Sequence, residues 1–153
     1  MPGLGRVPDF FVVGHPKSGT TALYEMLRRH PQIFMPDVKE PRFFDSDHRE
    51  QAGAAPYALE DYLALFAPAR PGQITGEASP SYLRSHVAAA AIAEQAPSAR
   101  AIAIFREPSS FIRSVHLQLV QEHIETERDL GRALAQEELT RGGRLVRRYA
   151  DRI

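Results

Sequence analysis

The sequence predicts an α/β protein with a parallel sheet, because strand-like apolar segments alternate with amphipathic helical segments. Residues 9–13 and 100–105 have the β-branched and apolar composition of buried strands, and residues 73–77 form a weaker third candidate. A segment with helical periodicity follows each of the three. With 153 residues, the chain is long enough for one domain that buries a sizeable core.

Proline and the periodic placement of apolar residues mark the expected helices. The first helix carries Leu23, Met26 and Leu27 on one face and ends before Pro31. The others are expected at 57–66, at 80–96 with Ser79 as N-cap, from Pro108 to about 124, and from a capping box at Thr126 and Asp129 to about Leu139. Residues 46–56 are expected to be a loop, residues 1–8 a flexible lead-in, and residues 9–153 one domain.

Three strands leave the edges of a parallel sheet open for further pairing. Parallel sheets normally have both faces covered as well. We therefore expect the chain to be the N-terminal part of a larger domain, incomplete at its C-terminal side.

The bulk composition excludes several classes of function. The chain has 19 basic and 19 acidic residues, so its net charge gives no reason to expect a nucleic-acid partner. It has no cysteine, which excludes disulfides, thiolate metal sites and a cysteine nucleophile. No apolar run reaches the length of a membrane span, and the first residues lack a signal-peptide core. We expect a cytoplasmic location, and the sequence does not indicate an oligomeric state.

The loop GHPKSGTT, residues 14–21, joins the first strand to the first helix. Gly14 and Gly19 have the spacing of the nucleotide-binding pattern G-x-x-x-x-G-K-[ST], but Thr20 stands where that pattern has its lysine. The lysine of this loop comes earlier, at Lys17. The loop therefore predicts a phosphate-binding cradle that is not built for a Mg-nucleoside triphosphate. The alternative is a chance turn rich in glycine and threonine.

Two further stretches carry candidate functional residues. The strand 100–105 is followed by Arg106, where a Mg-nucleotide enzyme often has an aspartate, and Ser114 lies eight residues further on. An arginine at the carboxyl end of a parallel strand can bind a second phosphate. The alternative is a surface arginine or an ion pair with Glu107. In the stretch KEPRFFD, residues 39–45, Glu40 is a candidate general base. A solvated turn above an aromatic anchor is the alternative.

The motifs PKSGTT, KEPRFF, GEASPSYL and REPSSFIRS, taken together and in this order, resemble the sulfotransferase superfamily. The resemblance covers about residues 9–150 and is closest to bacterial proteins similar to the glycosaminoglycan sulfotransferases. It implies a P-loop-like, three-layer α/β fold with a parallel sheet flanked by helices. It also implies transfer of a sulfonate group from 3′-phosphoadenosine 5′-phosphosulfate, without a metal, to a hydroxyl or amine of a small molecule, lipid or glycan.

The resemblance also implies roles for individual residues. Lys17 would stabilise the charge on the leaving oxygen, and Glu40 would be the general base on the acceptor. Arg106 and Ser114 would bind the 3′-phosphate. The 5′-phosphosulfate would be held by the loop residues Pro16, Lys17, Ser18, Gly19, Thr20 and Thr21.

The sequence departs from the glycosaminoglycan-type pattern at three positions. Arg42 stands where those enzymes have histidine, Ala78 where they have lysine, and Glu107 where the usual motif has aspartate. His15 is a fallback base, although it lies in a different segment from the histidine used by the other large branch. Because the family domain is longer than this chain, an inactive or binding-only fragment stays an alternative, as does a P-loop NTPase or kinase.

Overall fold

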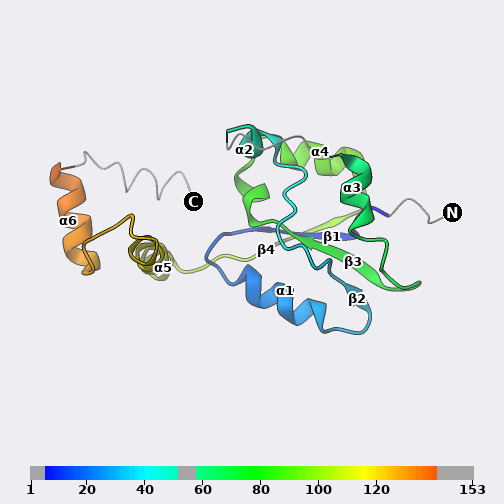
Figure 1. Cartoon of the computed structure of the whole chain (residues 1–153), viewed down its shortest axis with the longest axis horizontal. Helices are drawn as coiled ribbons and strands as arrows, with labels where there is room; N and C mark the ends of the chain where they lie inside the picture. The colour runs from blue at the N-terminus through cyan, green and yellow to red at the C-terminus, as the bar shows by residue number, and fades with distance from the viewer. Residues whose placement is uncertain (1–5, 52–57, 141–153) are drawn as a thin grey trace. The chain divides into compact units, whose positions relative to one another are not determined.

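The computed structural model describes residues 6–51 and 58–140 (Figure 1). Part of the expected N-terminal lead-in, residues 1–5, and the last residues of the expected domain, 141–153, lie outside this range. The chain divides into two compact units, residues 1–104 and residues 105–153.

The first unit is built on a parallel sheet of four strands in the order β2-β3-β1-β4. The predicted strands are confirmed as β1 (Phe10–Gly14), β3 (Ile74–Ala78) and β4 (Arg100–Ala103). The expectation of three strands is wrong by one, because β2 (Ile33–Phe34) pairs with the first residues of β3. A two-residue strand has no periodicity of its own, so only its pairing with β3 defines it.

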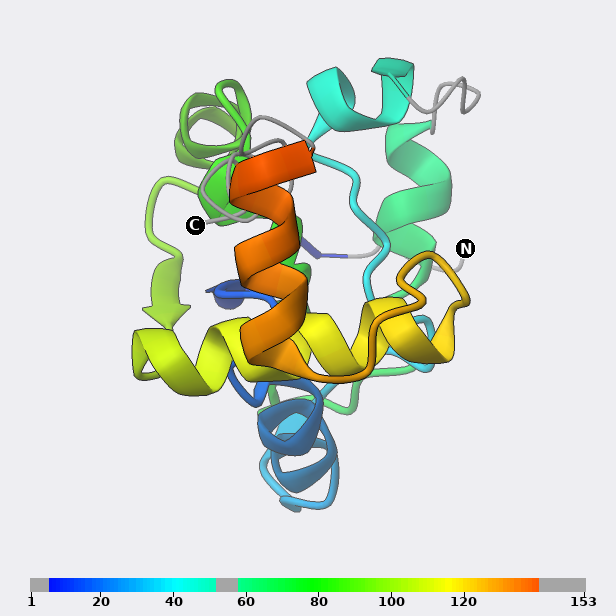
Figure 2. The same ribbon diagram turned by 90° about the vertical axis from the view of Figure 1, so that its left-hand side faces the viewer.

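Helices cover both faces of this sheet. In both views α1 (Thr20–Arg28) lies on one side of the sheet, and α2 (Ser46–Gln51), α3 (Leu59–Ala64) and α4 (Ala88–Gln95) lie on the other (Figures 1 and 2). This confirms the three-layer arrangement. None of the helices within the two described ranges is long and apolar enough to cross a membrane.

The alternation of side chains along β1 divides the core of the first unit into two clusters. Phe10 and Val12 pack with Tyr24 of α1, whereas Phe11 packs on the opposite face. The cluster around Phe11 is mainly aromatic and contains Phe44, Tyr62, Phe66 and Tyr82. Its rings meet edge to face, as for Phe11 and Phe44, whose centroids lie 5.6 Å apart.

Two further expectations about this unit are wrong. Residues 46–51 form helix α2, and the expected helix over 80–96 is two elements, a 3₁₀-helix η1 (Pro80–Arg84) and α4. The helical conformation is interrupted at Ser85, whose hydroxyl accepts hydrogen bonds from the N–H groups of Val87 and Ala88. Ser79 makes no capping bond to η1. Proline and a run of alanines give no local signal of this break.

The second unit contains α5 (Pro108–Gln121) and α6 (Leu130–Thr140). Phe111, Val115 and Leu119 form a buried stripe along α5. At the start of α6 the Asp129 carboxylate accepts a hydrogen bond from the N–H of Arg132 at 2.8 Å. The cap of this helix is therefore Asp129, and the expectation that Thr126 opens the helix is wrong.

Gly76 is the position in the sheet where a side chain is least tolerated. A Cβ atom there would lie 2.0 Å from Cζ of Phe10, its partner in the β1–β3 register. We expect Gly76→Ala to lower the free energy of unfolding by about 1–3 kcal/mol, because the stiff ring must leave its place in the core. Urea unfolding followed by circular dichroism measures this free energy. An unchanged midpoint would show that the core accommodates the extra methyl group without loss of stability.

Candidate functional site

The loop between β1 and α1 has the backbone geometry of an anion cradle. Gly19 adopts a left-handed conformation with φ of 95°, and its carbonyl accepts the first helical hydrogen bond from Leu23 at 3.0 Å. The N–H groups of the first helical turn have no partner within the helix and carry partial positive charge. Lys17 is exposed in the same loop, and Thr20 is buried where the helix begins.

The cradle is fixed on both sides by the ends of neighbouring strands. At the ends of β1 and β4, His15 N donates to Ile104 O at 2.7 Å, and Ile104 N donates to Gly14 O at 2.8 Å. On the other side, Ser79 N donates to Val12 O at 3.1 Å. A Cβ atom on Gly14 would lie 2.8 Å from Cβ of Leu83, so only glycine allows η1 to approach this strand end so closely.

The chain leaves β1 and β3 on opposite faces of the sheet, through α1 after β1 and through α4 after β3 (Figures 1 and 2). In open α/β sheets, ligands bind outside the carboxyl ends of two such neighbouring strands. The cradle follows the carboxyl end of β1. The fold therefore supports the ligand site that the loop predicts.

Glu40 is attached to the carboxyl end of β3, next to the cradle strand. Its N–H donates to the carbonyl of Ala78 at 3.1 Å, and its exposed carboxylate lies 2.6 Å from the ammonium group of Lys39. Because β3 pairs with β1, the predicted base and the predicted cradle lie at the same edge of the sheet. Glu40 and the loop of residues 14–21 thus follow the carboxyl ends of two paired strands.

The residues at the departures from the family pattern have other partners. The side chain of Arg42 donates to the carboxylate of Asp45 at 3.1 Å, and Asp45 is completely buried. Ala78 is buried in the core cluster beside α1. His15 is only 4% exposed, and its Nδ1 lies 2.8 Å from the carbonyl oxygen of Pro16. This burial gives His15 little access to an acceptor.

Arg106 and Ser114, the predicted 3′-phosphate ligands, belong to the second unit. Arg106 is exposed just before α5, and Ser114 is half-buried within it. Between them, the Glu107 carboxylate caps α5 by accepting from the N–H groups of Ser109 and Ser110. Hydrogen bonds from Ser109 and Ser110 lower the pKa of Glu107 to about 2. Glu107 thus starts the helix in the place of the usual aspartate.

Glu77 is completely buried in β3, and no sequence motif predicted a role for it. Its carboxylate accepts hydrogen bonds from Tyr62 at 2.5 Å, Ser79 at 2.5 Å and Tyr82 at 3.2 Å. Burial raises the pKa of Glu77 to about 7, although these three hydroxyls lower it and Asp45 adds to the rise. The sequence signal that could have identified Glu77 is an acidic residue inside a predicted buried strand, because a buried charge requires hydrogen-bond or ionic partners.

The raised pKa of Glu77 has a consequence for stability. The folded state binds the Glu77 proton up to about pH 7, whereas the unfolded state releases it near 4.5. The contribution of Glu77 to stability is therefore full at low pH and is lost as the pH rises through 7. Between about pH 5 and pH 8, we expect the wild type to lose about 2 kcal/mol more unfolding free energy than Glu77→Gln. Urea titrations at both pH values measure this difference, and parallel pH dependences would contradict it.

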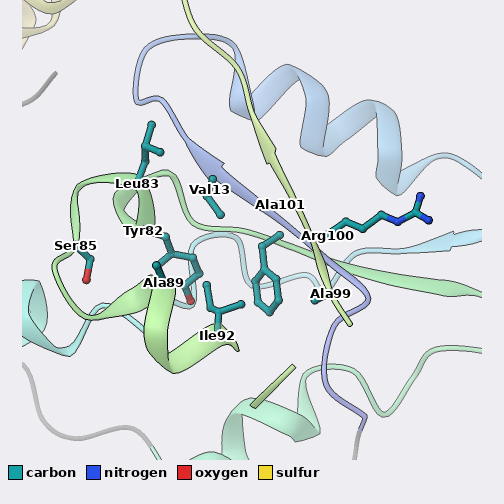
Figure 3. A pocket seen from close by; sticks show the side chains of 10 residues that line it. Val13, Tyr82, Leu83, Ser85, Ala89, Ile92, Ala99, Arg100 and Ala101 are labelled. Atoms are coloured by element: carbon teal, nitrogen blue, oxygen red, sulfur yellow. The ribbon is translucent and has the colours of Figure 1, made fainter. Parts of the chain in front are cut away.

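A cavity of about 260 Å³ lies on the face of the sheet that carries α4. Side chains of β1 and β4, among them Val13 and Ala101, line it together with Tyr82 and Ile92, while the guanidinium of Arg100 points away (Figure 3). Its lining is mostly apolar, which does not suit a phosphate. Within residues 6–51 and 58–140, no cluster of three or more histidine, aspartate or glutamate side chains could hold a metal ion.

A parallel sheet whose central strand leads through a glycine loop into a helix defines a P-loop-like α/β protein. The sulfotransferase domain family matches residues 7–139, and the chain belongs to this family. The resemblance inferred from the four motifs is thereby confirmed.

Individual relatives agree with this assignment. Human heparan sulfate glucosamine 3-O-sulfotransferase 6 is 36% identical over 107 residues, which cover 70% of this chain and 29% of that protein. Human carbohydrate sulfotransferase 15 is 40% identical over 65 residues, covering 39% of this chain and 12% of that protein. The crystal structure of a sulfotransferase from Alicyclobacillus acidocaldarius matches with a TM-score of 0.71 and 30% identity, over 86% of this chain and 57% of that one. The chain therefore spans only part of the length of these relatives.

Proposed function

We propose that this protein transfers a sulfonate group from 3′-phosphoadenosine 5′-phosphosulfate to a hydroxyl or amine of a small molecule, lipid or glycan. The observation that carries the proposal is that the glycine loop and Glu40 both lie at the carboxyl edge of the paired strands β1 and β3. The names of the relatives, heparan sulfate and carbohydrate sulfotransferases, favour a carbohydrate hydroxyl as the acceptor.

The residues of the cradle fit the phosphosulfate end of this donor. A phosphosulfate presents several negatively charged oxygens, which need cationic and N–H donors rather than acceptors. The loop supplies the N–H groups at the start of α1, the ammonium group of Lys17 and the hydroxyls of Ser18 and Thr21. Arg106 and Ser114 would add donors for the 3′-phosphate.

When bound, the donor supplies a sulfonate group on a phosphate leaving group. In the proposed in-line displacement, the acceptor oxygen bonds to sulfur while the bond from sulfur to the bridging oxygen breaks. The electron pair stays on the 5′-phosphate oxygen, where Lys17 stabilises the developing charge. Glu40 takes the proton of the acceptor hydroxyl. Lys39 holds the Glu40 carboxylate at 2.6 Å until the acceptor arrives.

Calorimetry with adenosine 3′,5′-bisphosphate tests donor binding, with adenosine 5′-monophosphate as the control that lacks the second phosphate. We expect tighter binding of the bisphosphate without Mg²⁺. Mass spectrometry of glycan, lipid and phenol acceptors then detects the added sulfonate group. Binding without transfer to any of them would favour a binding-only protein, and Mg²⁺-dependent binding of ATP instead would favour a P-loop NTPase or kinase.

A further inference from the structure

The buried Glu77 carboxylate is linked through two hydroxyl groups to the loop of residues 39–45, which carries Glu40. Above about pH 7, where Glu77 is ionised, its carboxylate only accepts hydrogen bonds, so Ser79 and Tyr82 both donate their hydroxyl hydrogens to it. Burial and the nearby Glu77 raise the pKa of the Tyr82 hydroxyl above its ordinary value, which keeps Tyr82 a donor. With their hydrogens committed to Glu77, the two hydroxyl oxygens are left as acceptors.

The 39–45 loop uses these oxygens as acceptors. The N–H of Arg42 donates to Ser79 Oγ at 3.1 Å, and the N–H of Phe44 donates to Tyr82 Oη at 3.3 Å. Together with the bond from Glu40 N to Ala78 O, the N–H groups of residues 40, 42 and 44 are bonded to β3, to Ser79 and to η1, respectively. Two of these three attachments depend on hydroxyls that Glu77 orients.

The loop requires such attachments because its backbone is strained. Glu40 has φ of 57° and Arg42 has φ of 55°, in the left-handed region that side-chain-bearing residues rarely adopt. Such conformations persist only where the surroundings hold them, and they concentrate at functional sites. The strained residues include the candidate base itself.

We propose that Glu77 is a positioning residue that holds the 39–45 loop, and with it Glu40, through the hydroxyls of Ser79 and Tyr82. The part that concerns Glu40 rests on the proposed function. Glu77 is buried and bonded to hydroxyls, so it acts on the reaction only through the loop.

Two tyrosines provide a matched pair of variants. Tyr62→Phe and Tyr82→Phe each remove one hydroxyl that donates to Glu77, and each keeps its ring in the aromatic cluster. Only the Tyr82 hydroxyl of the two is bonded to Phe44 N–H. A purely structural role of Glu77 predicts similar effects of both variants, whereas a positioning role predicts that Tyr82→Phe alone releases the loop.

The first measurement needs no turnover. We expect the Phe44 amide hydrogen, followed by NMR, to exchange about tenfold faster in Tyr82→Phe and at the wild-type rate in Tyr62→Phe. Equal exchange rates in both variants would overturn the proposal. Because this readout does not involve sulfonate transfer, it decides on the attachment of the loop even if the proposed function fails.

The second measurement is kinetic. We expect Tyr82→Phe and Glu77→Gln to lower kcat by roughly 10- to 100-fold, with the affinity for adenosine 3′,5′-bisphosphate unchanged. In a Glu40→Gln background, Tyr82→Phe should have no further effect, because both changes act through one carboxylate. Independent, multiplicative losses of kcat would overturn the link to Glu40. If Glu77→Gln does not fold, the two tyrosine variants still decide.

Discussion

Replacing Lys17 by methionine is expected to lower kcat by roughly 10²- to 10³-fold. The ammonium group would face the oxygen that gains negative charge as the sulfonate leaves, so its contribution is larger in the transition state than in the bound donor. Methionine keeps the length of the side chain and removes its charge. It is a better probe than alanine, because lysine and methionine both have flexible unbranched side chains at the left-handed φ of 62°.

The measurement is kcat at saturating donor and acceptor, together with calorimetric affinity for adenosine 3′,5′-bisphosphate. The affinity should fall much less than kcat, because the bisphosphate lacks the sulfonate whose transfer builds the charge. Arg29→Met, which removes an exposed cation at the C-terminal end of α1, is the matched control. If Lys17→Met turned over at the wild-type rate, Lys17 would have no part in the chemical step.

The second large effect is expected at Glu40. Glu40→Gln keeps the shape of the side chain but removes its capacity to accept a proton, and we expect kcat to fall roughly 10²- to 10⁴-fold. The backbone attachment of residue 40 to Ala78 does not involve the side chain, so the loop should keep its place.

Steady-state kinetics with the most reactive acceptor compares kcat of Glu40→Gln with that of the wild type. Glu25→Gln, on the exposed face of α1, controls for the loss of one negative charge from this unit. A Glu40→Gln variant with undiminished kcat would assign the proton transfer to another group. The buried position of His15 makes it a poor substitute.

Local sequence patterns predicted the part of the fold that carries the cradle. The apolar strand, the glycine loop and the amphipathic helix are contiguous in the sequence, and the structure confirms β1 and α1 with the loop between them. Glu40 was predicted as a base from its motif, whereas its position at the carboxyl end of β3 follows from its backbone bond to Ala78.

The remaining features of the fold and the site depend on contacts between residues far apart in the sequence, which no local pattern contains. Ser79 before a proline predicts a helix cap, but its hydroxyl instead donates to Glu77 and accepts from Arg42 N–H. The β2 strand exists only through its pairing with β3. Thr75 and Glu77 of β3 and Ser79 directly after it alternate along the chain and are all completely buried, although the sequence indicated only a weak, polar strand here.

The left-handed backbone at Arg42 affects which substitutions at this position engineering or evolution would favour. Glycine or asparagine would suit that φ better and would relieve strain, at the expense of the ion pair with Asp45. Selection for heat resistance alone would favour such replacements, whereas selection for turnover would retain whatever keeps Glu40 in place. Position 42 is therefore a point where thermal robustness and catalytic fitness are expected to trade against each other.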